Sequence, residues 1–230
     1  MDEFIIIAHR GASGYELENS YAAFEKAIKL KADMIETDIH ETYDGYLILM
    51  HDGKIDRTTF GSGKIKKLTI QQIKNVKMKN NDPIPVLDDV LKKYNKKIGF
   101  NLEIKSKNIE TKISDIIEKY ELIDSILISC FSYKTLKKLR LINPRLRLAL
   151  LTFLPTNLLP FNSFLKHLKS IKIDAVNPFY KFISKKYVKK LHENDIKIYP
   201  WTVNNKETIL KLKNQVEVDG IITNFPDILS

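Results

Sequence analysis

Short apolar segments alternate with helix-like segments along most of this 230-residue chain. Each apolar segment has the length of a β-strand, and the segment after it spaces its apolar residues as an amphipathic helix does. Eight segments of this kind are expected to be strands: residues 4–8, 33–39, 99–105, 126–131, 146–152, 174–177, 196–203 and 220–224. Successive strands are far enough apart for the crossover connections that parallel strands require. The sequence therefore predicts an α/β protein with a parallel sheet.

Eight strand–helix units predict a closed TIM (β/α)₈ barrel, and a doubly wound open sheet is the alternative. Barrels of this type commonly form one domain of about this length. No repeat, low-complexity tract or linker divides the sequence. We therefore expect a single domain over residues 1–230, with a short helical insertion at about 52–98.

A further strand at residues 47–50 follows the second strand too closely to run parallel to it. Asp44-Gly45 between the two predicts a β-hairpin with a two-residue turn. In that register Asp38 lies directly opposite His51. Glu36 is two residues before Asp38, so both carboxylates point to the same face of the strand. A slip of one residue in the turn would direct His51 away from that face.

Polar side chains collect where the predicted parallel strands end. In (β/α)₈ barrels, the chemistry takes place at these carboxyl ends. The residues at or near the ends are His9, Arg10, Glu36, Asp38, Glu103, Lys105, Trp201 and Asn224. A purely structural role does not explain why so many charged residues share one rim. The set therefore indicates an active site.

The acidic members of this set predict a metal site. Glu36, Asp38 and Glu103 offer only oxygen ligands, which suit one divalent ion, Mg²⁺ or Ca²⁺. Arg10 and Lys105 are the complementary cations expected around a phosphate group. We therefore expect an anionic, phosphate-containing substrate.

His9 and His51 are the groups in this set that can transfer protons near neutral pH. Two imidazoles beside a metal and two cations describe phosphodiester cleavage by acid–base catalysis. The sequence leaves open which histidine is the acid and which the base in the first step.

Each residue taken alone also has a structural explanation. Glu36 could form a salt bridge with Arg10, and Glu103 with Lys105. Trp201 could cap the barrel core, although its place at a strand end also suits the wall of a substrate pocket. The presence of the whole set on one rim favours function over these alternatives.

The formal net charge of +10 is consistent with an anionic substrate or a membrane surface. The lysines are spread over predicted helices with little aromatic interleaving, so a nucleic-acid partner is not expected. No apolar segment is long enough to span a bilayer, and no basic leader precedes the first strand. We expect a cytoplasmic protein without stable membrane insertion, whose oligomeric state the sequence leaves open.

Ten short motifs stand in the order and spacing of a known family. They are His9-Arg-Gly11, Glu18-Asn19, Glu36-Thr-Asp38, Asp44-Gly45, His51-Asp52, Arg57-Thr-Thr59, Pro85-Val-Leu87, Asn101-Leu-Glu-Ile-Lys105, Trp201-Thr-Val-Asn204 and Asp219-Gly-Ile-Ile-Thr223. Together they resemble the glycerophosphodiester phosphodiesterase family over nearly the whole chain. The resemblance implies a TIM barrel that hydrolyses glycerophosphodiesters to glycerol 3-phosphate and an alcohol.

The resemblance also implies a role for each matching residue. The implied acid–base pair is His9 and His51, and the implied metal ligands are Glu36, Asp38 and Glu103. Arg10 and Lys105 would hold the phosphate, and Trp201 would line the substrate pocket. The short insertion resembles the compact bacterial or archaeal form of the family.

Three positions depart from the family pattern. Leu17 stands where proline is usual, Cys130 where serine is common, and Asn224 where aspartate is frequent. None of them removes a catalytic or metal position. Two other functions stay open at this point, a lysophospholipase D-type lipid phosphodiesterase and a non-catalytic barrel that binds an anion.

Overall fold

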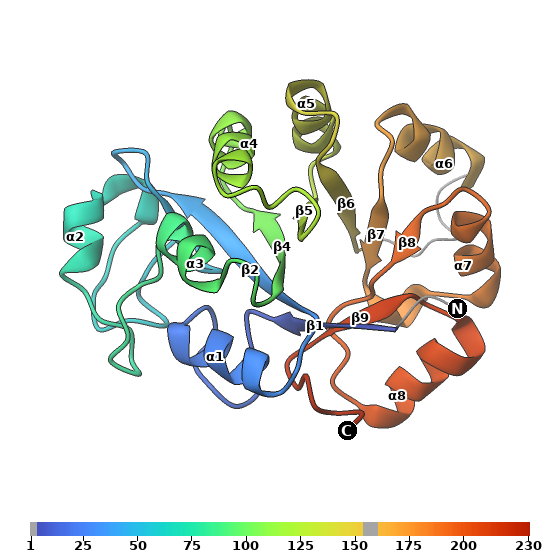
Figure 1. Ribbon diagram of the computed structural model, residues 1–230, viewed down its shortest axis with the longest axis horizontal. Coiled ribbons are helices and arrows are strands. Elements are labelled where there is room, and N and C mark those ends of the chain that lie inside the picture. The colour runs from blue at the N-terminus through green and yellow to red at the C-terminus, as the bar shows by residue number, and fades with distance from the viewer. Residues whose placement is uncertain (1–3, 154–160) are drawn as a thin grey trace.

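A single curved sheet forms the centre of the molecule (Figure 1). The structure is a computed structural model that describes residues 4–153 and 161–230. Within these residues the strands are β1 (Ile5–His9), β2 (Met34–Glu41), β3 (Leu47–Leu49), β4 (Gly99–Ile104), β5 (Ile126–Cys130), β6 (Arg147–Thr152), β7 (Ala175–Pro178), β8 (Lys197–Ile198) and β9 (Gly220–Thr223). Eight of them are neighbours in the order β8-β7-β6-β5-β4-β2-β1-β9, and β3 lies off this path and pairs with β2.

Backbone hydrogen bonds bring the two ends of this sheet together. The N–H of Asp219 donates to the carbonyl of Ile198 at 3.2 Å, and the N–H of Ile222 donates to the carbonyl of Pro200 at 2.9 Å. The parallel strands therefore form a nearly closed ring. The predicted TIM barrel is confirmed, and the doubly wound alternative is wrong.

Strand β8 is shorter than the predicted strand at residues 196–203. Pro200 lacks the N–H that a ladder needs, and regular pairing ends before it. Beyond it, Trp201 forms an isolated parallel bridge with Phe179. The chain therefore still follows the neighbouring strand up to the rim.

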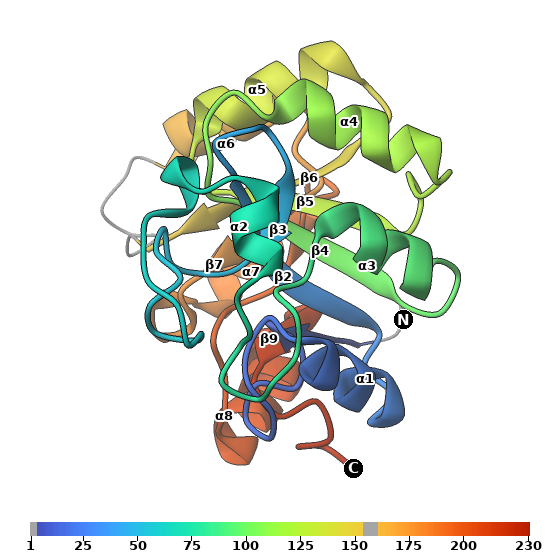
Figure 2. The same ribbon diagram turned by 90° about the vertical axis from the view of Figure 1, so that its left-hand side faces the viewer.

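Helices cover the outside of the ring (Figures 1 and 2). They are α1 (Tyr21–Lys29), α2 (Ile70–Lys74), α3 (Leu87–Tyr94), α4 (Glu110–Lys119), α5 (Tyr133–Ile142), α6 (Phe161–Ser170), α7 (Lys185–His192) and α8 (Lys206–Lys211), with single turns η1 (Ile65–Lys67), η2 (Tyr180–Phe182) and η3 (Leu212–Val216). Ser20, Ser132 and Ser184 accept backbone hydrogen bonds as the N-caps of α1, α5 and α7.

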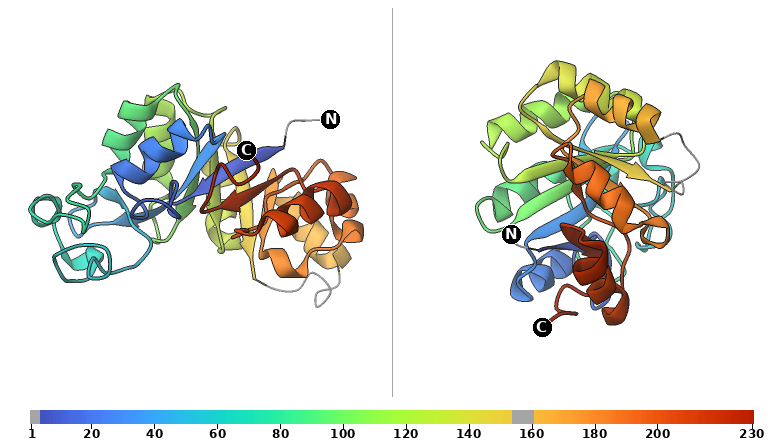
Figure 3. Two further views of the ribbon diagram at one scale, coloured as in Figure 1. Left: turned by 90° about the horizontal axis from the view of Figure 1, so that it is seen from below. Right: turned by 90° about the vertical axis from the view of Figure 1, so that its right-hand side faces the viewer.

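The insertion between β3 and β4 projects from one end of the molecule (Figure 3, left). It has a small core of its own, which includes Ile55, Ile73 and Met78 and extends to Ile48 and Met50 of the hairpin. Because these side chains are buried, the insertion is fixed against the β3 segment. This attachment holds the loop after Met50 in place.

The hairpin forms as predicted, but its turn is one residue longer. Ile39 pairs with Leu49 and Glu41 with Leu47, so Asp38 lies opposite Met50, and the predicted pairing of Asp38 with His51 is wrong. Gly45 adopts a φ of +87°, which is the left-handed position of a three-residue turn.

Contacts outside the Asp44-Gly45 pair favour the longer turn. The Asp44 carboxylate accepts hydrogen bonds from the Thr42 hydroxyl at 2.7 Å and from the backbone N–H of Ile70 at 2.9 Å. We expected a shift of one residue in the turn to direct His51 away from Glu36 and Asp38. This prediction is also wrong, because His51 still lines the pocket at the barrel rim. Strand β3 ends at Leu49, so strict alternation of faces no longer applies at His51.

Gly11 allows the sharp turn that follows β1. Its φ is +79°, and an added Cβ would lie 2.7 Å from the backbone carbonyl carbon of Ala23. We expect Gly11→Ala to lower the free energy of unfolding by about 2–4 kcal/mol, because strain and overpacking combine. Gly53→Ala is the control, since the nearest atom there is 4.0 Å away, in the His40 ring. Equal stability of the two variants in urea denaturation would contradict this explanation of the turn.

Candidate active site

A pocket of about 190 Å³ opens at the carboxyl ends of the strands. The predicted site residues that line it are His9, Arg10, Glu36, His51, Glu103, Lys105 and Trp201. Asp38 does not line the pocket but lies beside Glu36 and Glu103. The structure therefore brings the complete predicted set to one place.

The three acidic residues form a tight, buried group. One carboxylate oxygen from each of Glu36, Asp38 and Glu103 lies within 4.8 Å of the others. All three residues are buried, and Glu36 Oε1 has no hydrogen-bond partner among the described residues. A buried carboxylate oxygen without a donor is unfavourable unless a cation or a ligand meets it. The donor set and its burial fit one hard divalent metal ion.

Two cations partly neutralise these carboxylates. Lys105 Nζ lies 3.1 Å from Asp38 Oδ1 and 2.5 Å from Glu103 Oε1, so the salt bridge that the sequence left open is present. The Arg10 guanidinium lies 3.4 Å from Asp38. Arg10 contacts Glu36 through its backbone N–H, at 2.9 Å, and not through its side chain. Three carboxylates against two cations leave an excess negative charge.

The crowding of the carboxylates appears in their pKa values. Burial, together with Asp38 and Glu103, raises the pKa of Glu36 well above its usual value. Burial and the Asp38 charge raise the pKa of Glu103 to about 7. Burial alone would raise the pKa of Asp38, but Lys105 and Arg10 outweigh it and keep that pKa below its usual value. Glu36 and Glu103 therefore hold protons more tightly than ordinary carboxylates do.

His9 is oriented by a residue from the last strand segment. Its Nδ1 lies 2.7 Å from Asn224 Oδ1, and its Nε2 lies 4.0 Å from Glu36 Oε2. Because the amide oxygen can only accept, Nδ1 carries the proton and Nε2 has the free lone pair. Burial, and then the Arg10 charge, lower the pKa of His9 to about 4. The imidazole is therefore neutral near pH 7.

His51 is oriented in the same manner by its neighbour in sequence. His51 Nδ1 lies 2.8 Å from Asp52 Oδ1. The carboxylate accepts a hydrogen bond from the Nδ1–H group, which leaves Nε2 available. The His51 side chain is 36% exposed, so it is more accessible than His9, at 18%. Among the described residues, each histidine thus has a hydrogen-bond partner at Nδ1 and none at Nε2.

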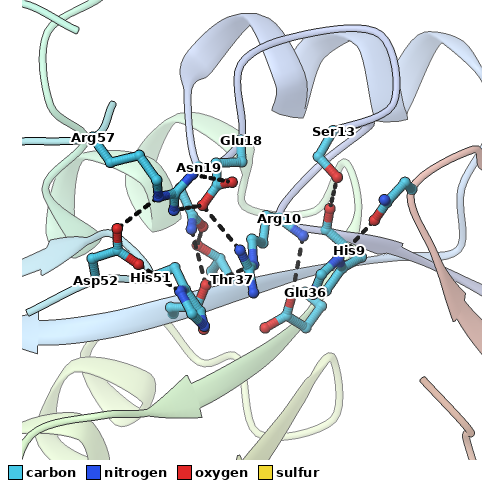
Figure 4. A network of polar contacts seen from close by, with 12 residues as sticks. His9, Arg10, Ser13, Glu18, Asn19, Glu36, Thr37, His51, Asp52 and Arg57 are labelled. Carbon is cyan, nitrogen blue, oxygen red and sulfur yellow. Dashed lines mark hydrogen bonds and ion pairs between the residues drawn. The ribbon is translucent and has the colours of Figure 1, made fainter. Parts of the chain in front are cut away.

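A polar network behind these residues was not assigned a role from sequence (Figure 4). Glu18 accepts hydrogen bonds from Arg10 and Arg57, and Arg57 also donates to Asp52. Asn19 donates to Asp38 at 2.9 Å. Glu18, Asn19, Asp52 and Arg57 all belong to motifs of the family resemblance, and that was the only signal pointing to them.

Aromatic side chains form part of the pocket wall. The rings of Trp201 and Phe153 meet edge to face with centroids 4.7 Å apart, and Phe131 stacks on Phe153 at 5.0 Å. The Trp201 indole N–H donates to the carbonyl of Asn177 at 2.7 Å, which fixes the ring. Of the two positions predicted for Trp201, the cap of the barrel core and the pocket wall, the residue occupies the pocket wall. Phe131 and Phe153, which the sequence did not single out, line the pocket with it.

Acidic residues, cations and two histidines at the carboxyl end of a TIM barrel are typical of enzymes that cleave phosphate esters. Residues 9–228 match the glycerophosphoryl diester phosphodiesterase family. A glycerophosphodiester phosphodiesterase of Caldanaerobacter subterraneus is 34% identical over 238 residues, which cover 98% of this chain and 96% of that protein. One of Bacillus subtilis is 31% identical over 252 residues, covering 99% of this chain and 85% of the relative. The chain therefore belongs to this family and is a phosphodiester hydrolase. These matches confirm the family resemblance.

Solved structures agree on the fold. A glycerophosphodiester phosphodiesterase of Thermotoga maritima superposes with a TM-score of 0.85 at 22% identity, over 100% of this chain and 98% of that one. A phosphodiesterase of Oleispira antarctica, solved with the product sn-glycerol-3-phosphate, superposes with a TM-score of 0.87 at 23% identity, over 97% and 94% of the two chains. Across residues 4–153 and 161–230, helices that combine the length and apolar character needed to cross a bilayer are absent.

Proposed function

We propose that this enzyme hydrolyses glycerophosphodiesters to glycerol 3-phosphate and an alcohol, with His9 and His51 as its acid–base pair. The observation that carries the proposal is the matched orientation of the two imidazoles. Each has a polar partner at Nδ1, and both line the pocket that Glu36 and Glu103 also line. Proton transfer by two such groups is the chemistry that a phosphodiester requires, since one oxygen attacks and another leaves.

The proposed metal ligands are Glu36, Asp38 and Glu103. One divalent ion, Mg²⁺ or Ca²⁺, would supply positive charge against the charge that develops on the phosphate. The family and the acidic group support metal dependence in general.

Arg10 and Lys105 are proposed to bind the phosphate oxygens. Both line the pocket and both already contact carboxylates there, so their positions are fixed before substrate arrives. One histidine, in its neutral form, removes at its free Nε2 a proton from the attacking oxygen, which belongs to water or to the neighbouring glycerol hydroxyl; in the second case water then opens the cyclic phosphate. The other histidine, in its protonated form, gives a proton to the leaving oxygen.

Trp201 is proposed to contact the carbon skeleton of the substrate. The Oleispira protein with bound glycerol 3-phosphate supports a small glycerophosphodiester as the substrate. Family membership favours catalysis over the non-catalytic, anion-binding alternative. A cytoplasmic location and the lack of a nucleic-acid partner remain predictions from sequence.

Substrate preference tests the proposal against lysophospholipase D-type activity. We expect kcat/KM for glycerophosphocholine to exceed that for lysophosphatidylcholine by at least about tenfold, because a pocket of about 190 Å³ suits a short polyol better than an acyl chain. Choline release from both substrates, measured under identical metal conditions, provides the comparison. A clear preference for the lipid would instead assign the enzyme to lipid cleavage.

Metal affinity should depend on pH. Glu103, whose pKa is raised to about 7, and Glu36, whose pKa is raised well above its usual value, must lose protons when a cation binds. Lower pH therefore opposes binding, and we expect affinity for Mg²⁺ or Ca²⁺ to be at least about tenfold weaker at pH 6 than at pH 8. Calorimetric titration in buffers of different ionisation enthalpy would also detect the released protons. An affinity that is unchanged between these pH values would argue against a metal on these carboxylates.

A further inference from the structure

Arg57 does not line the pocket but contacts two carboxylates, those of Asp52 and Glu18 (Figure 4). Its Nε donates to Asp52 Oδ2 at 2.6 Å. Its Nη1 and Nη2 donate to the two oxygens of Glu18, at 2.8 and 2.6 Å. All three nitrogens of the planar guanidinium are therefore used, two of them in a bidentate pair.

Each of these two carboxylates also holds a residue that lines the pocket. Asp52 accepts the hydrogen bond from His51 Nδ1 at 2.8 Å. Glu18 accepts a hydrogen bond from Arg10 Nη1 at 3.0 Å. Arg57 thus reaches the proposed proton-transfer residue, His51, through Asp52. It reaches the proposed phosphate-binding residue, Arg10, through Glu18.

We propose that Arg57 is a positioning residue that sets the orientation of His51 through Asp52 and of Arg10 through Glu18. The inference rests on the proposed function of His51 and Arg10. It assigns to the insertion a part in catalysis, since Asp52 and Arg57 both lie at its start.

The electrostatics keep both carboxylates available as acceptors. The Arg57 hydrogen bond, followed by weaker effects that include the His51 hydrogen bond, lowers the pKa of Asp52 to about 2. Burial would raise the pKa of Glu18, but the Arg57 and Arg10 contacts outweigh it and lower that pKa. Both groups stay ionised over the neutral range, so the orienting hydrogen bonds persist there.

We call the contacts of Arg57 with Asp52 and Glu18 the clamp. Loss of the clamp should lower the catalytic rate more than it lowers the stability of the fold. The Arg57 side chain is 49% exposed, and ion pairs with such exposure contribute little to folding. Orientation of catalytic side chains by their neighbours commonly affects activity by about 10- to 100-fold. We therefore expect Arg57→Ala to lower kcat about 30-fold and to raise KM several-fold. Its Tm should stay within about 3 °C of the wild-type value.

Variants of the two carboxylates separate the two arms of the clamp. Asp52→Asn should lower kcat with little change in KM, because it disturbs His51 while Arg57 keeps its bidentate pair with Glu18. Glu18→Gln should chiefly raise KM, because it acts on Arg10. In the Arg57→Ala/Asp52→Asn double variant, kcat should be no lower than in the worse single variant, since both changes disturb one interaction.

A charge-conserving change and chemical rescue test the geometry. Arg57→Lys keeps the charge, but a single ammonium cannot reproduce the planar fork, so kcat should stay well below that of the wild type. Guanidinium at low millimolar concentration should restore part of the kcat of Arg57→Ala, whereas ammonium should not. Should Arg57→Ala fail to fold, Arg57→Lys carries the test.

Arg145→Ala is the control, because Arg145 is an exposed arginine whose ion pair with Glu118 lies outside this network. It should leave kcat and KM unchanged. Wild-type kcat and KM in Arg57→Ala or Arg57→Lys, beside an inactive His51→Ala, would overturn the clamp but leave the proposed function intact. A fully active His51→Ala would instead refute the proposed function. A large fall in Tm without rescue would reduce Arg57 to a structural role and also overturn the clamp.

Discussion

His51→Ala should lower kcat for glycerophosphocholine by about 10³-fold, within the range that general acid–base catalysis supplies. His9→Ala should have an effect of similar size, since each imidazole has its own proton to move. Metal affinity should stay close to the wild-type value in both variants, because the three carboxylates are untouched. Stopped assays of choline release, with metal affinity measured on the same samples, give both quantities.

His192→Ala is a closely matched control for His51→Ala. Its Nε2 lies 2.8 Å from Asp219, and its side chain is 37% exposed, against 36% for His51. The two histidines thus share a carboxylate partner and a degree of exposure, but only His51 lines the pocket. We expect wild-type activity from His192→Ala. Full activity in His51→Ala would remove it from the acid–base pair.

Glu36→Gln should weaken the binding of Mg²⁺ or Ca²⁺ on the order of 100-fold, because it removes one of three charged ligands. Turnover at limiting metal should fall accordingly, and excess metal should restore part of it. The amide also removes an ionisable group whose charged form is unfavourable beside Asp38 and Glu103, so the metal-free variant should be at least as stable as the metal-free wild type. A site built for stability would not behave in this way.

Glu110→Gln controls for the loss of a buried carboxylate. Glu110 is buried and pairs with Lys138 at 2.9 Å, away from the pocket. Its replacement should leave metal affinity unchanged. Activity of the wild type in excess chelator, or unchanged affinity in Glu36→Gln, would count against a metal at the acidic group.

The barrel and its rim could be predicted because both follow from local pattern. The barrel strands are short segments rich in apolar residues, and their last residues face the rim whatever the details of the connections. The i, i+2 spacing of Glu36 and Asp38 therefore survives as a shared face in the structure. His9, Glu103 and Lys105 reach the pocket for the same reason.

The turn of the hairpin could not be derived from its two central residues. Asp44-Gly45 suits a two-residue turn, and the same pair also ends a three-residue turn with Gly45 in the left-handed region. Ile70, 26 residues away, contributes the backbone N–H that holds Asp44. A contact of this range leaves no periodic signal in the sequence.

The partners of the catalytic candidates were missed for a similar reason. Asn224 meets His9 across 215 residues, and Arg57 meets Glu18 across 39. Such pairs depend on how the strand ends and the insertion come together in space. The family motifs marked Arg57 and Glu18 as positions, but only the folded arrangement gives them a physical role.

The most direct measurement is ³¹P NMR of glycerophosphocholine incubated with metal-loaded wild-type protein and with metal-loaded His51→Ala. The wild type should convert the diester signal into that of glycerol 3-phosphate. His51→Ala should bind metal equally well and leave the diester signal unchanged over the same period. Equal formation of glycerol 3-phosphate by both proteins, or an intact diester with the wild type, would contradict hydrolysis by this pair of histidines.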